Sequence, residues 1–352
     1  MREPLAVDLF SGAGGLSLGL KAAGFKVAAG VEMDRLASQT YALNNPDAIT
    51  INDDIRNVSA WKLKKDIGRR ISLLAACPPC QGFTSLTSKF RRDDPRNDLP
   101  SEVIRFARIL KPKAIMFENV PRFLTSARGK SRFDLVKREL EALDYKVTYC
   151  ILQAADFGSS QFRRRLVVFA ASSEIEPPKP THAQTASGDI AAWRTVKDKI
   201  GALGPAEPFQ PGKLSAPRPL AEWHVVRRLS DLNQRRLEAA VPDGARWDLP
   251  DELRPACHVG SSTGFRNVYG RMSWERPSPT ITGGCTSPSK GRFGHPEVAR
   301  TISVREAGLL QDFPDDYIVD AEGQIDRACE MIGNAFPARL AEAAARQVMA
   351  TL

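Results

Sequence analysis

The chain has 352 residues, of which 42% are hydrophobic and 26% charged. This composition can supply one large core or two smaller ones, and it excludes a disordered chain or a fibrous repeat. No stretch approaches the roughly 20 consecutive apolar residues of a membrane helix, and the N-terminus MREPLAVDLF lacks a signal-peptide pattern. We therefore expect a cytoplasmic globular protein with no membrane partner.

The formal net charge of +9 fits either a polyanionic partner or an ordinary solvated surface, and charge alone does not decide between them. The six cysteines are too sparse for a disulfide framework. In a reducing cytosol each of them would be a free thiol. They lie at positions 77, 80, 150, 257, 285 and 329.

The first half of the chain alternates short apolar runs with helix-compatible segments. Strands are predicted over residues 5–10, 25–33, 48–53, 72–79, 114–120, 146–152 and 165–171. Helices are predicted over residues 15–24, 101–111 and 133–143. This order predicts an α/β fold with a mostly parallel sheet and helices on both faces.

From residue 177 the sequence becomes rich in proline, glycine and polar residues, and it shows no sustained period until about residue 275. We predict a domain boundary there, followed by a smaller, loop-rich domain. Helical patterns return over residues 303–313 and 337–350.

The glycine-rich segment SGAGG links the first predicted strand to the first predicted helix. Gly12 and Gly14 would permit a tight turn and let a ligand approach the helix N-terminus, although a purely structural turn is a fair alternative. Glu32 follows Gly12 by 20 residues at the end of the second strand, where a carboxylate commonly binds ribose hydroxyls. Asp54 ends the third strand and could accept a hydrogen bond from an adenine amino group. The two acids favour an adenosine-containing cofactor, although each alone could be a solvated strand end.

Cys80 follows the fourth predicted strand and two prolines, at the carboxyl edge where parallel sheets place their chemistry. This position favours a nucleophile. Cys77 lies within the apolar run and is interpreted as a small buried hydrophobic residue. A redox CxxC pair usually opens a helix, whereas a strand ends here. A zinc site would need further ligands at suitable spacing, so no metal site is predicted.

Glu118 ends the fifth predicted strand, so it should lie at the same edge as Cys80, where a buried carboxylic acid could donate a proton. Arg163 and Arg165 are two residues apart at the start of the last strand and are expected to point together. An RRR triplet is otherwise often a wet basic surface. A thiol, an acid and paired cations predict attack on an electron-poor heterocycle that carries a carbonyl group.

These segments resemble the motifs of the cytosine-C5 DNA methyltransferases of the prokaryotic restriction-modification type. The matching blocks occur in the family's order from near the N-terminus to near the C-terminus. They are DLFSGAGGLSLG, VEMD, DDIR, PPCQGFT, ENV, QFRRR, RPSPTIT and IGNAFP. The last block departs from the family's G-N-x-V-P-P, since it has Phe336 and a single proline, Pro337.

The resemblance implies a Rossmann-like fold that uses S-adenosylmethionine and releases S-adenosylhomocysteine. It implies cofactor contacts from Phe10, Gly12, Gly14, Leu16, Glu32, Met33, Asp54, Ile55, Leu99, Asn334 and Ala335. The implied catalytic residues are Cys80, Glu118, Arg163 and Arg165, supported by Asn119, Gln161, Pro79 and Gln81. Cys80 would add to C6 of a flipped-out cytosine, Glu118 would contact N3, and one of the two arginines would stabilise charge at O2.

The resemblance also implies a division of labour along the chain. Residues 1–177, completed by 326–352, would form the catalytic and cofactor-binding domain, residues 178–275 the target-recognition domain, and residues 276–325 a hinge with the family's motif IX. Expected partners are double-stranded DNA and a cognate restriction endonuclease, bound by a monomer associated with the nucleoid. The candidate DNA-reading residues are His258, Arg266, Asn267 and Arg271, which loop polarity explains equally well. Ser85 and Arg96 could also contact DNA, with a disordered loop as the alternative.

Three alternatives remain open. A tRNA cytosine-C5 methyltransferase of the same family is disfavoured by the long basic insert between QFRRR and RPSPTIT, which suits duplex reading. A catalytically inactive DNA-binding protein is disfavoured by the joint presence of the thiol, the acid and the arginines. A thiol oxidoreductase would lose activity on Cys77→Ser, whereas a methyltransferase should tolerate change at Cys77 and fail without Cys80.

Overall fold

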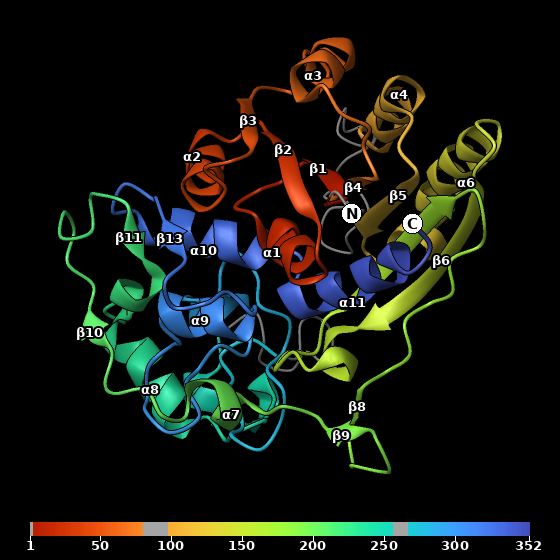
Figure 1. Ribbon diagram of the computed structural model, residues 1–352. Helices are drawn as coiled ribbons and strands as arrows, with labels where there is room; N and C mark the ends of the chain where they lie inside the picture. Colours follow the sequence, from red (N-terminus) through yellow and green to blue (C-terminus); the bar gives the residue numbers. More distant parts are fainter. Residues whose placement is uncertain (1–2, 80–97, 256–266) are drawn as a thin grey trace. The chain divides into compact units, whose positions relative to one another are not determined.

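The computed structural model describes residues 3–79, 98–255 and 267–352 (Figure 1). The chain forms two compact units. The first comprises Met1–Phe157, Arg164–Thr181 and Phe336–Leu352, and the second Gly158–Arg163 and His182–Ala335. The functional division into residues 1–177 with 326–352, 178–275 and 276–325 stays a prediction.

The first unit is built on a seven-stranded sheet of order β3-β2-β1-β4-β5-β7-β6. The strands from β1 to β5 pair in parallel, and β7 runs antiparallel to both β5 and β6. The sheet confirms the predicted α/β fold and all seven predicted strand positions. Their bounds are β1 Leu5–Leu9, β2 Lys26–Glu32, β3 Ile49–Asn52, β4 Leu73–Ala76, β5 Ala114–Asn119, β6 Lys146–Gln153 and β7 Arg164–Ala171.

Helices cover both faces of this sheet (Figure 1). One face, with Ala6, Leu73 and Met116, packs under α1 (Gly15–Ala22), α11 (Ala338–Met349) and Tyr41 of α2 (Arg35–Asn44). The other face, with Val7, Leu74 and Ile115, packs under α3 (Ala60–Ile67), α4 (Pro100–Leu110) and α6 (Ala127–Glu141). Alternate strand residues thus supply two cores, as expected for a sheet buried on both sides. The short α5 (Arg122–Thr125) and the 3-10 turn η3 (Ala154–Phe157) complete the unit.

The C-terminal helix α11 lies directly against α1. A Cβ built at Gly19 would be 2.4 Å from Ala341 Cβ, so the absence of a side chain allows the two helices to meet closely. Arg346 Nη2 also donates to the Ala22 carbonyl at 3.1 Å. The terminal helix therefore returns to the first unit, as predicted for the chain beyond about residue 336. The preceding helix α10 (Ile325–Asn334) belongs to the second unit.

The second unit is loop-rich in the part of it that the structure describes, as predicted. Its strands are two-residue pairs and most of its helices are short. They are β8 His182–Ala183, β9 Ala191–Ala192, α7 Val196–Ile200, β10 Glu207–Pro208, β11 Arg218–Pro219, η4 Leu220–Trp223, β12 Val225–Val226, α8 Asp231–Ala239, η5 Arg246–Asp248, η6 Asp251–Leu253, η8 Pro288–Lys290, α9 Val304–Leu310, β13 Ile318–Val319 and α10. Across both units, none of the described helices combines the length and the apolar character needed to cross a bilayer.

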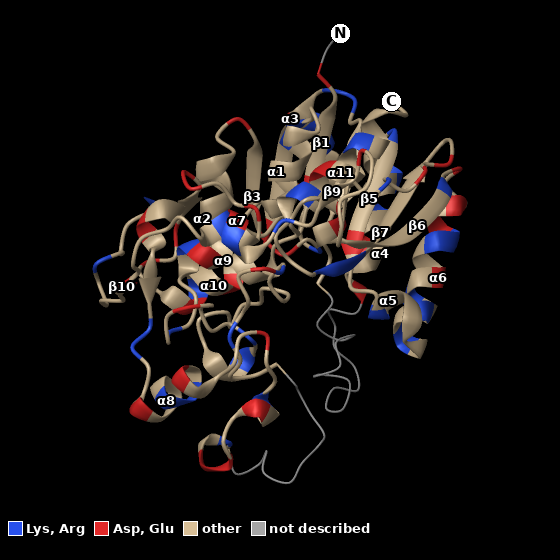
Figure 2. Cartoon of the chain, turned by 90° about the horizontal axis from the view of Figure 1, so that it is seen from below, with Lys and Arg blue, Asp and Glu red and all other residues tan. Residues whose placement is uncertain are grey.

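Some of the charged side chains form ion pairs with one another on the protein surface. Helix α6 carries both signs along its length (Figure 2), with Lys130 paired to Asp134 and Lys137 Nζ 3.6 Å from Glu141 Oε1. Such exposed i,i+4 pairs are worth only about 0.3–0.5 kcal/mol each. Side chains of both signs are therefore exposed together along this helix.

Candidate active site

Five polar side chains lie on one face of the sheet at its carboxyl edge, one from each of five neighbouring strands. Strand register places Asp8 opposite Ala75 and Ala76 opposite Phe117, so the next residue, Cys77, stands beside Glu118. The residues two positions away from Asp8, Cys77, Glu118 and Arg165 along the chain belong to the core under α1 and α11; they are Ala6, Ala75, Met116 and Val167. Gly30, two positions before Glu32, faces Tyr41 of the same core. The polar row therefore shares that face. In spatial order it comprises Glu32 of β2, Asp8 of β1, Cys77 directly after β4, Glu118 of β5 and Arg165 of β7.

Glu118 and Arg165 form an ion pair in this row. Arg165 Nε lies 2.5 Å from Glu118 Oε1, and the side chains are only 14% and 13% exposed. Because little water reaches the pair, its charges interact more strongly than those of a surface pair. The predicted position of Glu118 at the carboxyl edge is confirmed.

Asn119 holds the segment that leads toward the predicted nucleophile. Its buried side chain donates from Nδ2 to the Pro78 carbonyl at 3.3 Å and accepts from Val120 N at 2.9 Å. The first of these bonds joins the end of β5 to the prolines after β4, and Pro79 is half-buried there. Cys80 and Gln81 lie outside the described residues.

Arg163 and Arg165 do not point together, so that expectation is wrong. Arg163 is buried in the second unit, where Nη1 donates to the Ile281 carbonyl at 2.7 Å and Nη2 to the Gly333 carbonyl at 3.1 Å. The alternation rule fails because β7 begins at Arg164, which leaves Arg163 in the preceding non-strand segment. Gln161 is also buried there, with its amide bonded to Gln311 Oε1 at 2.7 Å.

The glycine turn has the positive φ angles that glycine permits in a tight turn. Phe10, Gly12 and Gly14 have φ angles of 56°, 53° and 97°, in the left-handed region that favours glycine. Glu32 holds the turn, since its Oε2 accepts from Gly12 N at 2.9 Å and its Oε1 from Asp34 N at 2.8 Å. Burial raises the pKa of Glu32, and these backbone hydrogen bonds oppose the shift.

The other predicted cofactor residues of the first unit divide into a surface group and a buried group. Met33 is 63% exposed, an unusual state for a large apolar side chain. Hydrogen bonds from Arg56 lower the pKa of Asp54 to about 2, so Asp54 remains a carboxylate. The buried group packs in the cores and comprises Leu16, Ile55 and Leu99. In the second unit, Asn334 is exposed at the end of α10 and Ala335 is half-buried.

These residues fit an adenosine-containing cofactor. Each Glu32 oxygen has a second lone pair beyond the one given to the backbone, so the carboxylate can still accept from ligand hydroxyl groups. The charged Asp54 is an acceptor only, as an amino-group partner should be. Met33 offers an uncovered apolar surface to a ring.

Asp8 is a site residue that sequence reasoning missed. It is fully buried, and its Oδ2 accepts from Ser17 Oγ of α1 at 2.6 Å. Ser17 Oγ is also 3.0 Å from Tyr41 Oη of α2. Asp8 Oδ1 has no hydrogen-bond partner among the described residues. Burial raises the pKa of Asp8 to about 7, although the hydrogen bond from Ser17 acts to lower this pKa. The acid inside the apolar run LAVDLF was the only sequence signal for this network.

The two described DNA-reading candidates are engaged within the second unit. Arg271 donates from Nε and Nη2 to the carbonyls of His295 and Pro296, each at 3.0 Å. Asn267 Oδ1 accepts from Arg292 Nη2 at 3.0 Å. A role for either in base reading stays a prediction. Ser85, Arg96, His258 and Arg266 lie outside the described residues.

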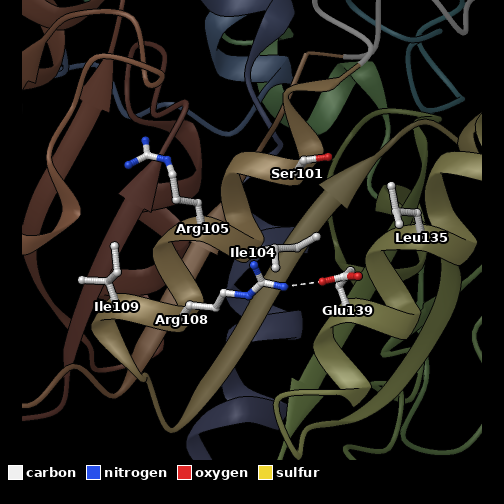
Figure 3. Close-up of a pocket in the computed structure, with 7 residues that line it drawn as sticks. All are labelled: Ser101, Ile104, Arg105, Arg108, Ile109, Leu135 and Glu139. Atoms are coloured by element: carbon white, nitrogen blue, oxygen red, sulfur yellow. Dashed lines mark hydrogen bonds and ion pairs between the residues drawn. The ribbon is translucent and has the colours of Figure 1, made fainter.

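A surface pocket of about 320 Å³ lies between α4 and α6 (Figure 3). Ile104, Ile109 and Leu135 line it, and Arg108 pairs with Glu139 across it. These helices cover the face opposite to the one that bears Glu118 and Arg165. The pocket is therefore separate from the polar row.

The sheet order with a reversed β7, together with the glycine turn and its acid, defines a Rossmann-like S-adenosylmethionine-dependent methyltransferase fold. A prophage-encoded DNA modification methyltransferase from Escherichia coli shares that fold, with a TM-score of 0.75 at 22% identity over 99% of both chains. Within this class, the family described as C-5 cytosine-specific DNA methylase matches residues 6–350. The chain belongs to this family and is a DNA cytosine-C5 methyltransferase.

Individual relatives agree with that assignment. The Type II methylase M.HgiDII of Herpetosiphon aurantiacus is 38% identical over 347 residues, which cover 97% of this chain and 94% of the relative. The Type II methyltransferase M1.HphI of Haemophilus parahaemolyticus is 34% identical over 349 residues, which cover 97% and 86%. The Dnmt2 methyltransferase of Schizosaccharomyces pombe has a TM-score of 0.61 at 16% identity, with 99% of both chains covered, and shares the fold alone.

Proposed function

We propose that this enzyme modifies a flipped-out cytosine within a specific duplex sequence, through a covalent bond between Cys80 Sγ and C6 of the base. The observation that carries the proposal is the Glu118–Arg165 ion pair. It lies at the carboxyl edge, where Glu118 is on β5, the neighbour of the strand β4 that leads to Cys80, and Arg165 is on β7, one strand further along the sheet. An acid and a cation held together there match the two ring positions at which electrons accumulate during attack.

In this mechanism the Cys80 thiolate adds to C6, and the displaced electron pair moves into the ring toward N3 and O2. Glu118 donates a proton to N3 as that charge arrives. Arg165 stabilises the charge at O2. We assign the O2 role to Arg165 rather than Arg163, because Arg163 already donates to two main-chain carbonyls. Asn119 keeps the prolines before Cys80 in place.

S-adenosylmethionine, when bound, supplies the methyl group that C5 receives. A base then takes the C5 proton, N3 returns its proton to Glu118, and the bond between C6 and Cys80 breaks, which restores the aromatic ring and the thiolate. Glu32 would accept from the ribose hydroxyls of the cofactor, Asp54 from its adenine amino group, and Met33 would cover the adenine ring. The turn at Gly12 and Gly14 would bring backbone close to the ligand. Contacts from Phe10, Leu16, Ile55, Leu99, Asn334 and Ala335 are carried over from the family's motifs.

The two relatives described above are named as Type II enzymes. We accordingly assign this protein to a restriction-modification system, in which a monomeric methyltransferase protects DNA from an endonuclease of the same sequence specificity. DNA from cells that express the protein should then resist one restriction specificity, and DNA from cells with the Cys80→Ala variant should not.

Bisulfite sequencing of DNA from expressing cells tests the function directly. One sequence context should be protected from conversion, and the Cys80→Ala protein should leave it unprotected. A parallel assay with labelled cofactor on duplex DNA and on transfer RNA separates the two substrate classes. Transfer to RNA alone would favour the tRNA methyltransferase, and no transfer to either would favour an inactive DNA-binding protein. Undiminished methylation by Cys80→Ala would contradict the covalent mechanism.

A further inference from the structure

Cys77 is the one member of the polar row that the proposed function leaves unused. It directly follows β4, its backbone N donates to the Leu9 carbonyl at 3.1 Å, and its half-buried side chain packs against the core under α1 and α11. As expected from the sequence, it fills a small apolar space. Its thiol also has polar neighbours that the sequence did not reveal.

The thiol lies between the two acids of the row. Strand register places Cys77 beside Glu118 on the same face of the sheet, and Glu118, Asp8 and Arg165 all lie close enough to act on the charge of its thiol. Burial, followed by the negative charges of Glu118 and Asp8, raises the pKa of the Cys77 thiol well above its usual range. Cys77 therefore stays protonated at neutral pH, where it is a hydrogen-bond donor and a poor nucleophile.

The Glu118 carboxylate thus has a donor group on each neighbouring strand, namely Arg165 of β7, which pairs with it, and the protonated thiol of Cys77 after β4, which lies beside it in the register of the strands. A carboxylate with a single partner can turn about its terminal bond, since that torsion is broad and soft. A second donor from the opposite side restricts this rotation. General acid catalysis needs the carboxyl group within hydrogen-bond reach of the ring nitrogen, so its orientation affects the rate.

Asp8 extends the polar row from Cys77 toward the glycine turn. Asp8 is held by Ser17 through Oδ2, while its Oδ1 has no partner among the described residues. Strand register places Cys77 between Asp8 of β1 and Glu118 of β5. The buried polar row is therefore continuous from Tyr41 and Ser17, through Asp8 and Cys77, to Glu118 and Arg165.

We propose that Cys77 is a positioning residue for Glu118, whose carboxylate its thiol orients from the side opposite Arg165. This inference rests on the proposed role of Glu118 at N3 of the cytosine. A positioning role differs from a space-filling role, because the rate of catalysis should then depend on the hydrogen-bond donor of the Cys77 thiol and not on its volume. It also predicts a cost at a position where the sequence alone suggested near tolerance.

A pair of substitutions separates the donor from the volume. Cys77→Ala removes the donor, and the single-turnover rate of methyl transfer to duplex DNA should fall on the order of tenfold, as expected when a hydrogen bond to a charged group is lost. The KM for S-adenosylmethionine should stay within about twofold, since the affected group acts on the base. Cys77→Ser retains a donor and should recover most of the lost rate. Cys150→Ala serves as the control, since Cys150 is a half-buried cysteine of β6 in the same unit.

A second measurement does not depend on catalysis. Glu118→Gln removes the neighbouring negative charge, so the pKa of the Cys77 thiol should fall and its alkylation by iodoacetamide at pH 8, followed by peptide mass spectrometry, should accelerate several-fold. Glu102→Gln on α4 is the control, because Glu102 pairs with Arg105 rather than with the row. This readout remains valid even if the wild-type protein methylates no DNA, which would refute the proposed function alone.

The outcomes are distinct. A rate for Cys77→Ala within twofold of the wild type overturns the inference, and so does an equal loss in Cys77→Ser and Cys77→Ala. An unchanged rate of Cys77 alkylation in Glu118→Gln would show that Glu118 does not act on the thiol, and this result also overturns the inference. A loss in Cys77→Ala that Cys77→Ser restores, together with faster alkylation in Glu118→Gln, supports it.

Discussion

Arg165 Nε lies 2.5 Å from Glu118 Oε1, and both side chains are largely shielded from solvent. The two residues come from strands β7 and β5, which pair antiparallel, with Glu118 opposite Val167. Because β7 runs in reverse, its first residues reach the carboxyl edge of the parallel strands. The strand reversal therefore brings a cation to the edge where parallel strands place their chemistry.

Glu118→Gln should abolish most catalysis while the fold persists. The amide has nearly the same shape but cannot donate an acidic proton, and it leaves Arg165 without its charged partner. We expect methyl transfer to fall about 10²- to 10⁴-fold, the usual range for loss of a general acid. The measurement is tritium transfer from labelled S-adenosylmethionine to duplex DNA, with Glu102→Gln as the control for loss of a carboxylate outside the polar row. Activity of Glu118→Gln within tenfold of the wild type would argue against its role at N3.

The sequence predicted the sheet well because each strand is an apolar run of the right length between turn residues. It did not predict the separation of Arg163 from Arg165, because that depends on β7 beginning at Arg164. It also could not reveal Asp8, since one acid in an apolar run becomes a buried carboxyl group only after α1 and α2 have packed over it. Local pattern thus located the strands, whereas the contacts among their polar residues arose from tertiary packing.

Asp8 should make the first unit less stable as pH rises. Its pKa is raised from 3.8 to about 7 in the folded protein, so the folded state holds the proton more tightly than the unfolded chain does. The stabilisation is complete below about pH 4 and is lost as pH rises through 7, by on the order of 4 kcal/mol over the whole window. Asp8→Asn carries no ionisable group there and should not lose stability in this way.

The measurement is urea unfolding of the wild type and Asp8→Asn at several pH values between 5 and 8. The free energy of unfolding of Asp8→Asn minus that of the wild type should increase with pH. Using this difference cancels the titration of all groups that the two proteins share. A difference that stays constant across the range would mean that Asp8 titrates normally.

Gln311 should be important to the stability of the second unit. Its Nε2 donates to the Ile332 carbonyl at 2.7 Å and its Oε1 accepts from Gln161 Nε2 at 2.7 Å, both deep in the interior. Gln311→Leu would remove one hydrogen bond from the Ile332 carbonyl, which still accepts from Ala335 N, and one from Gln161 Nε2, which still donates to the Leu310 carbonyl. Each lost bond should cost about 0.5–1.5 kcal/mol. We expect a lower unfolding midpoint in urea. Gln234→Leu is the matched control, because the Gln234 amide donates to Glu238 on the surface of α8, and it should change the midpoint little. Equal midpoints for Gln311→Leu and the wild type would refute this prediction.

Gly19→Ala provides a test in which two effects oppose each other. Alanine in a helix interior is favoured over glycine by about 1 kcal/mol, so propensity alone predicts that the variant of α1 is more stable. The new Cβ, however, would lie 2.4 Å from Ala341 Cβ and 2.6 Å from the Ala338 carbonyl oxygen, which forces α11 away from α1. Overpacking of this kind typically costs about 1–3 kcal/mol, and here backbone atoms must also move, so packing should outweigh propensity. We expect a lower thermal unfolding midpoint for Gly19→Ala. Gly204→Ala should leave it nearly unchanged, because a Cβ there meets no atom within 4 Å. A more stable Gly19→Ala protein would show that α11 does not press on α1 as closely as described.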